Sequence, residues 1–145
     1  MKLSTRSRYA TRALIEMARF FGKRPATRKE LAQKETLSES YLENLLTTLK
    51  CRGLISTVRG AQGGYALSRP PETITVFDIV NAVEGNVFPV DCVAHQQECS
   101  KCDECVTREV WQELYEEIAR VLHKYTLKDL LAKKNHKAGN LAPAA

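Results

Sequence analysis

The stretch from Thr27 to Leu67 constrains the fold most, because two short helices in it directly precede a glycine-rich β-hairpin. Thr27-Arg-Lys-Glu30 has the spacing of a capping box, in which the side chains and backbone N–H groups of the first and fourth residues bond reciprocally. Ser38 stands where an N-cap would start the second helix. That helix carries a buried stripe of leucines, at Leu42, Leu45, Leu46 and Leu49. The pattern predicts a helix-turn-helix or a plain helical hairpin.

The segment that follows favours the helix-turn-helix. A short β-branched run, Leu54–Val58, leads into Arg59-Gly60-Ala61-Gln62-Gly63-Gly64, and Tyr65–Leu67 completes the hairpin. Gly60 and the other glycines let the backbone approach another surface closely. An arginine at the base of such a tip suits the narrow, electronegative minor groove of DNA. The hairpin is therefore interpreted as a wing.

Charge is distributed unevenly along the chain. Residues 1–69 carry 14 Lys and Arg against 5 Asp and Glu, whereas residues 70–145 carry 8 against 12. The basic half is the expected partner of a polyanion, although an unevenly charged solvated surface is the alternative. No run of about twenty apolar residues would span a membrane, and the N-terminus lacks the apolar segment of a secretory signal. We therefore expect a cytoplasmic protein without a membrane partner.

Four of the five cysteines lie within fourteen residues, at spacings of six, two and two intervening residues: Cys92, Cys99, Cys102 and Cys105. In a reducing compartment, clustered cysteines bind metal more often than they form disulfides. A metal or cluster site, a disulfide switch and an inert loop all remain open at this point. Cys51, at the end of the second short helix, is interpreted as a separate structural thiol.

The remaining segments predict further helices. Amphipathic periodicity predicts a first helix over residues 4–21, and Thr75-Val-Phe-Asp78 is a second capping box that opens a helix through Val83. A long helix from about residue 107 to 125 carries a continuous apolar stripe. It would pair with its copy in a two-fold dimer or pack against the first helix. A short helix follows Thr126.

We therefore predict a mainly α fold with a small β-wing. Residues 1–84 form a winged helix-turn-helix domain, and residues 85–105 form a cysteine loop. Residues 106–133 form the dimerisation helix and a short C-terminal helix. Residues 134–145 are expected to be a disordered tail.

Several motifs together closely resemble the iron–sulfur cluster regulator (IscR) family with its NsrR, RirA and CymR relatives. They are residues 1–10, Ser40–Glu43, Gly53–Gly60, Gly63–Tyr65 and Cys105–Trp111, and the resemblance extends to about residue 133. It implies a dimeric winged-helix transcription factor. A loop between the wing domain and the dimer helix would bind the cluster.

The resemblance also implies which residues contact DNA: Ser38, Ser40, Tyr41 and Glu43 on the recognition helix, and Arg59 with Gly60 in the wing. These roles are chemically reasonable. Glutamate accepts from cytosine N4, serine and tyrosine donate to phosphate or base, and arginine enters the minor groove. Ser38 also serves as a helix cap, and a partly buried Tyr41 is the alternative for that residue.

Three cysteines match the ligand positions of the family: Cys92, Cys99 and Cys105. The relatives complete the site with a histidine or with a carboxylate. The matching positions here are Arg108 and Arg8, and arginine does not ligate metal. Cys102 supplies a fourth thiolate instead, which gives the usual complement of an iron–sulfur cluster. We favour [4Fe–4S] over [2Fe–2S], because the histidine of the [2Fe–2S] relative is missing.

The sequence therefore predicts a regulator that binds palindromic double-stranded operator DNA as a homodimer. It would sense cluster status, redox state, iron or nitric oxide through the cluster. The alternative is a winged-helix module that binds a regulatory protein partner, or a thiol- or zinc-based regulator without a cluster. The chain lacks a paired acid/base constellation, a phosphate loop and a second cluster motif, so we do not expect an enzyme or an electron carrier.

Overall fold

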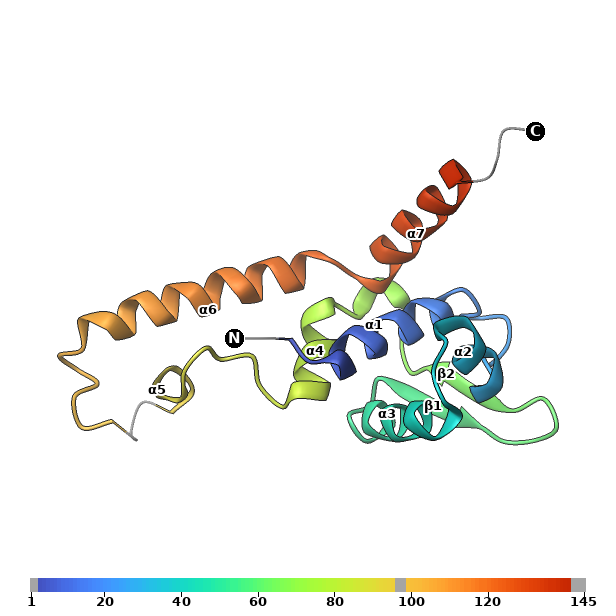
Figure 1. The fold of residues 1–145 in the computed structure, drawn as a ribbon, viewed down its shortest axis with the longest axis horizontal. Helices are drawn as coiled ribbons and strands as arrows, with labels where there is room; N and C mark the ends of the chain where they lie inside the picture. The colour runs from blue at the N-terminus through green and yellow to red at the C-terminus, as the bar shows by residue number, and fades with distance from the viewer. Residues whose placement is uncertain (1–2, 96–98, 142–145) are drawn as a thin grey trace.

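The computed structural model describes residues 3–95 and 99–141 (Figure 1). These residues form seven α-helices, one 3₁₀ helix at Pro71–Thr73 and one two-stranded antiparallel sheet. The mainly α fold with a small β-wing is thereby confirmed. The helices are α1 (Thr5–Ala18), α2 (Arg28–Glu35), α3 (Glu39–Cys51), α4 (Val76–Glu84), α5 (Asp91–Ala94), α6 (Val106–Lys124) and α7 (Leu127–Leu141), and the strands are β1 (Ile55–Val58) and β2 (Gly64–Leu67).

The predicted helix caps form. The Thr27 hydroxyl accepts from the backbone N–H of Glu30 while Glu30 accepts from the Thr27 N–H, and Thr75 and Asp78 make the same reciprocal pair. Ser38 accepts from the backbone N–H of Tyr41 and starts α3. These bonds satisfy N–H groups that a helix leaves without intrahelical partners.

One core holds α1 to α4, the sheet and the start of α7 together. The four leucines of the α3 stripe are buried, and α1 contributes Ala10, Ala13, Leu14 and Met17 to the same cluster. Ile74, Ile79 and Leu127 are fully buried beside them. The core thus fixes α3 and the hairpin relative to each other.

The wing is anchored to the segment before α2. Its strands pair from Ile55 with Leu67 to Val58 with Gly64, and the backbones of Ala26 and Tyr65 exchange two hydrogen bonds of 2.8 Å. A Cβ atom on Gly64 would lie 2.4 Å from the carbonyl oxygen of Ala26. The close approach of these two backbones therefore requires glycine at position 64.

Gly64→Ala is expected to lower the free energy of unfolding by about 1–3 kcal/mol, because a backbone contact must open. Urea unfolding followed by circular dichroism measures the change. Gly139→Ala is the matched control, since its Cβ meets no atom within 4 Å and its helical position favours alanine. An unchanged stability of Gly64→Ala would contradict the anchoring of the wing.

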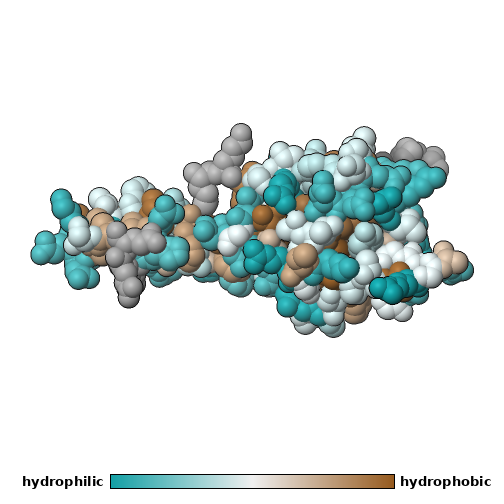
Figure 2. Space-filling model, turned by 90° about the horizontal axis from the view of Figure 1, so that it is seen from below, coloured by the Kyte–Doolittle hydropathy of each residue, from teal (hydrophilic) through white to brown (hydrophobic). Residues whose placement is uncertain are grey.

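Helix α6 extends from the core as an arm whose far end carries α5 and the cysteine loop (Figure 1). Stacked rings hold it to the rest of the chain: Phe77 lies on His123 with centroids 4.0 Å apart, and Phe88 on Tyr115 at 4.4 Å. No α6 residue is buried. Apolar side chains lie exposed along the arm (Figure 2), namely Val106, Val110, Trp111, Leu114 and Val121.

The prediction of a disordered tail from residue 134 is wrong for residues 134–141, because α7 continues to Leu141. Its start is fastened by buried Leu127 and by a capping arrangement between Thr126 and Asp129. The Lys134 ammonium then pairs with the buried Glu16 carboxylate of α1. This tertiary contact supports a helix that local propensity leaves marginal. Residues 142–145 of the predicted tail lie outside the described residues.

Within residues 3–95 and 99–141, no helix is both long and apolar enough to cross a membrane.

Candidate functional site

The N-terminal end of α3 presents most of the predicted DNA-contacting residues. Ser38 and Ser40 are exposed, and Tyr41 is half-buried. The rings of Tyr41 and Tyr9 form a T-shaped pair with centroids 6.1 Å apart. The contact with Tyr9 of α1 agrees with a partly buried Tyr41, and the contact of Tyr41 with DNA stays a prediction. The hydroxyl of Ser38 is engaged as the cap of α3.

Glu43 is exposed one turn further along α3, and an arginine from another helix holds its carboxylate. Nη1 of Arg28, the first residue of α2, lies 2.8 Å from Glu43, and Nε of the same side chain lies 3.0 Å from Glu39. Arg28 is not among the site residues that the sequence predicts. The sequence contains the charged residues Arg28, Glu39 and Glu43, but the angle between α2 and α3 that brings them together depends on tertiary packing.

Arg59 and Gly60 are exposed at the wing, beyond the last residue of β1. Gly60 has a φ of 113°, and its carbonyl accepts from the N–H of Gly63 at 3.0 Å, which closes the tip. Strand β1 packs beside α3 (Figure 1). The structure therefore presents the recognition helix and the wing together, as a winged helix requires to contact adjacent grooves.

The cysteine loop lies at the far end of the arm. Cys92 is on α5, and Cys105 directly precedes α6. Both are half-buried together with Cys102, whereas Cys99 is exposed. All four thiols are free. The hydroxyl of Thr107 and the backbone N–H groups of Arg108 and Thr107 hold the pKa of the Cys105 thiol below its ordinary value, which favours the thiolate that binds metal.

The described residues contain no group of three or more His, Cys, Asp or Glu side chains placed to hold a metal ion. As donors the four thiols fit a cluster, but their placement would have to tighten around it. The two arginines at the positions that match the fourth ligand of the relatives make other contacts. Arg108 donates to the Cys92 carbonyl at 3.3 Å, and Arg8 donates to the Thr5 hydroxyl. His95 is exposed directly after α5. The four-cysteine ligand set stays a prediction.

Glu84, the last residue of α4, contacts the start of α1. Its Oε1 accepts from the Ser4 backbone N–H at 3.0 Å, from the Ser4 hydroxyl at 2.6 Å and from the Ser7 hydroxyl. Burial opposes ionisation of Glu84, but these hydroxyls and the N–H outweigh it and hold its pKa below the ordinary 4.5. From the first turn of α1, Arg6 donates to Thr48 of α3 at 3.2 Å. Because Glu84 and Ser4 are 80 residues apart, no local sequence signal indicates this contact.

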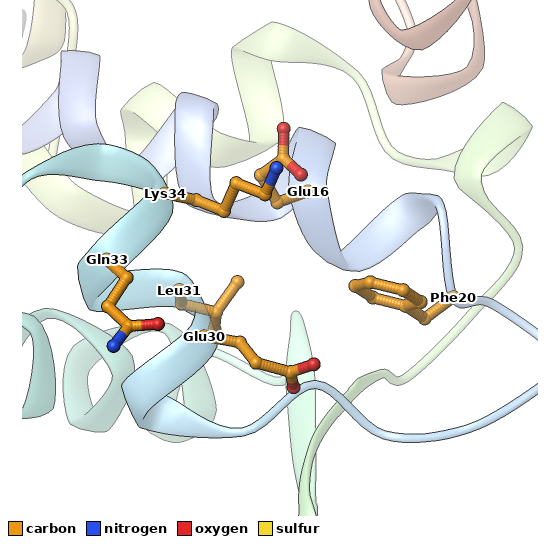
Figure 3. Close-up of a pocket in the computed structure, with 6 residues that line it drawn as sticks. All are labelled: Glu16, Phe20, Glu30, Leu31, Gln33 and Lys34. Carbon is orange, nitrogen blue, oxygen red and sulfur yellow. The ribbon is translucent and has the colours of Figure 1, made fainter.

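A cavity of about 320 Å³ lies between α1 and α2, outside both predicted sites (Figure 3). Lys34 extends toward the Glu16 carboxylate, and Phe20 stands across the cavity from them. Burial opposes ionisation of Glu16, but the charges of Lys134 and Arg19 hold its pKa below the ordinary 4.5. The charge of Glu16 is therefore compensated within the chain, and its pairing with Lys134 fastens α7 to α1.

Comparison with known proteins identifies relatives over nearly the whole chain. The profile of the Rrf2 family, described as an iron-dependent transcriptional regulator, matches residues 3–133. Protein rrf2 of Nitratidesulfovibrio vulgaris is 39% identical over 150 residues, which cover 100% of this chain and 99% of the relative. Among solved structures, CymR of B. subtilis, described as its global cysteine regulator, has a TM-score of 0.76 at 36% identity and covers 92% of this chain and 98% of its own. IscR of T. potens has a TM-score of 0.74 at 35% identity and covers 99% and 94%.

Proposed function

Because this chain belongs to the Rrf2 family of transcriptional regulators, we propose that it binds palindromic operator DNA as a homodimer and that an iron–sulfur cluster on its cysteine loop controls this binding. The observation that carries the proposal is the position of the four free thiols. Along the chain they lie between α4 and α6. Helix α4 contacts the start of α1 through Glu84, and α6 carries exposed apolar side chains.

The DNA-binding part of the proposal is supported by α3 and the wing, which pack into one hydrophobic core. Ser40 and Glu43 read base edges in the major groove, and Arg59 enters the adjacent minor groove. Ser38 and Tyr41 contact phosphates and fix the register on the duplex. The exposure of Ser38, Ser40, Glu43 and Arg59 supports these assignments, and Tyr41 is half-buried.

The homodimer is supported by the exposed apolar face of α6. Val106 is 76% exposed and Val110 is 56% exposed, and helices on the surface of a monomer normally turn such residues inward. A second copy of the same helix would cover the stripe in a two-fold interface. Two wing domains related by that axis match the two halves of a palindrome.

Cys92, Cys99, Cys102 and Cys105 would hold the cluster, because four thiolates are the usual complement of [2Fe–2S] and [4Fe–4S] centres, of which we favour [4Fe–4S]. When bound, the cluster supplies reversible electron transfer and sensitivity to oxidants, nitric oxide and iron supply. The protein would respond through a change in the position of its helices. Tightening of the thiols would shift α5 and the backbone that follows α4, and Glu84 would pass that shift to α1 and Thr48.

Glu84→Gln tests this path and its pH dependence. The pKa of Glu84 is lowered in the folded state, so its contribution to stability is present above the ordinary value of 4.5 and is lost as pH falls through the folded value. We expect the variant to lose about 1 kcal/mol at neutral pH, because hydrogen bonds to an exposed carboxylate are screened by solvent.

The stability gap between wild type and Glu84→Gln should close in acid, as urea unfolding at several pH values would measure. Glu72→Gln serves as the control, since Glu72 accepts no side-chain hydrogen bond within the described residues. A gap that stays constant below the ordinary glutamate pKa would contradict the assigned role of Glu84.

Iron and sulfide counts on anaerobically purified protein, with its absorption spectrum, test cluster binding. We expect iron and acid-labile sulfide in equal amounts and a thiolate-to-iron charge-transfer spectrum. A colourless protein containing zinc would contradict the cluster. A steep fall of DNA affinity with salt separates an operator-binding protein from a protein-interaction module.

A second candidate is a thiol-based regulator without a cluster. It is supported by the four free thiols of the loop, which lie close together in the sequence. Reversible disulfide formation between loop cysteines would then carry the signal. Metal-free protein whose operator affinity changes with a dithiol reductant would support this candidate.

A further inference from the structure

We propose that Arg28 of α2 is a positioning residue for Glu43 and thereby sets how strictly the protein selects the base pair that Glu43 faces. The proposal rests on the proposed DNA-binding function and names a specificity determinant outside the recognition helix. The Arg28 side chain lies between two carboxylates, 2.8 Å from Glu43 and 3.0 Å from Glu39.

The two carboxylates need such a partner. Glu39 and Glu43 are one helical turn apart on α3, and their side chains are 49% and 53% exposed. Like charges at this spacing repel each other, and both would meet the phosphates of DNA. A guanidinium has five N–H donors in a planar fork, so Arg28 donates a hydrogen bond to Glu39 through Nε and forms an ion pair with Glu43 through Nη1. A lysine ammonium lacks this rigid geometry.

Holding the carboxylate affects sequence selection. In the major groove, cytosine offers the N4 amino donor to a glutamate, whereas guanine offers only acceptors there. A glutamate that is already fixed loses little rotamer freedom on binding. A glutamate that is not held turns toward solvent when guanine replaces cytosine. It then avoids the unfavourable contact between its carboxylate and the guanine acceptors. Arg28 therefore increases the difference in affinity between sites with the right and the wrong base.

Neighbouring charges do not duplicate this role. Arg24 pairs at 2.7 Å with Glu30, which belongs to the capping box of α2, and Arg12 pairs with buried Glu35. Within the described residues, Arg28 is the salt-bridge partner of both Glu39 and Glu43. An arginine that only contacted phosphate would position the protein without carrying sequence information.

The test uses the full chain. The wild-type protein first selects its operator from a pool of random duplexes, and fluorescence anisotropy then measures affinity for every single-base-pair variant of that operator. Arg28→Ala, Arg28→Lys, Glu43→Ala and the double variant Arg28→Ala/Glu43→Ala are compared. Arg24→Ala is the matched control, because it removes the same charge from a neighbouring pair.

We expect Arg28→Ala to reduce discrimination about three- to tenfold at one position of each half-site, which corresponds to the loss of part of one base contact. Glu43→Ala should remove discrimination at that same position, and Arg28→Ala should then have no further effect on it. Arg28→Lys should restore part of the selectivity, and Arg24→Ala should leave it unchanged.

Uniform weakening on all sequences by Arg28→Ala, with a shallower salt dependence, would identify a phosphate contact and overturn the proposal. So would a change in selectivity that persists in the double variant. Failure of the wild-type protein to select any sequence would instead contradict the proposed function. Unfolding midpoints confirm that each variant is folded, and Arg28→Lys, which keeps the charge, provides the second variant.

Discussion

Leu114→Glu is expected to dissociate the homodimer and to weaken operator binding by more than about 100-fold. Leu114 is 42% exposed on the chain alone and lies within the apolar stripe of α6. A two-fold interface would bury two introduced carboxylates close together, and each unpaired buried charge costs several kcal/mol. About 2.8 kcal/mol already corresponds to a factor of 100 in affinity.

Analytical ultracentrifugation, with and without operator duplex, measures the effect. Glu113→Gln is the control, because it changes the charge of the adjacent residue by one unit without touching the apolar stripe. We expect this control to remain dimeric. A Leu114→Glu protein that stays dimeric and binds operator normally would show that the exposed face of α6 has another role.

Cys102→Ser is expected to abolish stable cluster binding, or to reduce cluster occupancy at least about tenfold, because three thiolates leave one coordination position without a protein ligand. Arg108 and Arg8 cannot replace the lost thiolate, and both side chains are directed to other groups. Iron and sulfide counts and the lifetime of the absorption spectrum under air measure the change.

Cys51→Ser is the matched control, since Cys51 is a free, exposed thiol at the end of α3, outside the loop. Its cluster content should equal that of the wild type. If Cys102→Ser retains the wild-type spectrum and cluster lifetime, the fourth ligand lies elsewhere, and exposed His95 is the next donor to replace.

Local chemistry made much of the fold predictable. The caps at Thr27, Ser38 and Thr75 depend on contacts between residues three apart, and the leucine stripe of α3 depends on helical periodicity. The wing followed from β-branched residues around a glycine-rich tip, and the strands form there. Such signals lie within one or two turns of chain, so a single sequence contains them.

Contacts between distant segments were not predictable in the same way. Lys134 reaches Glu16 over 118 positions and extends a helix that composition alone indicated to be a tail. The Arg28 and Glu84 contacts depend on how helices pack, which residue spacing does not specify. For the cysteine loop, spacing indicates the donor set, but the arrangement of the thiols around a cluster stays a prediction.

The most direct test of the central claim is the affinity of the selected operator for cluster-loaded protein and for cluster-free protein, measured anaerobically at the same salt concentration. Coupling between two sites typically changes affinity by about 5- to 150-fold. We expect a difference within this range, and we expect Glu84→Gln to reduce it. Equal affinities of the two forms for every palindromic site tested would contradict the claim that the cysteine loop controls DNA binding.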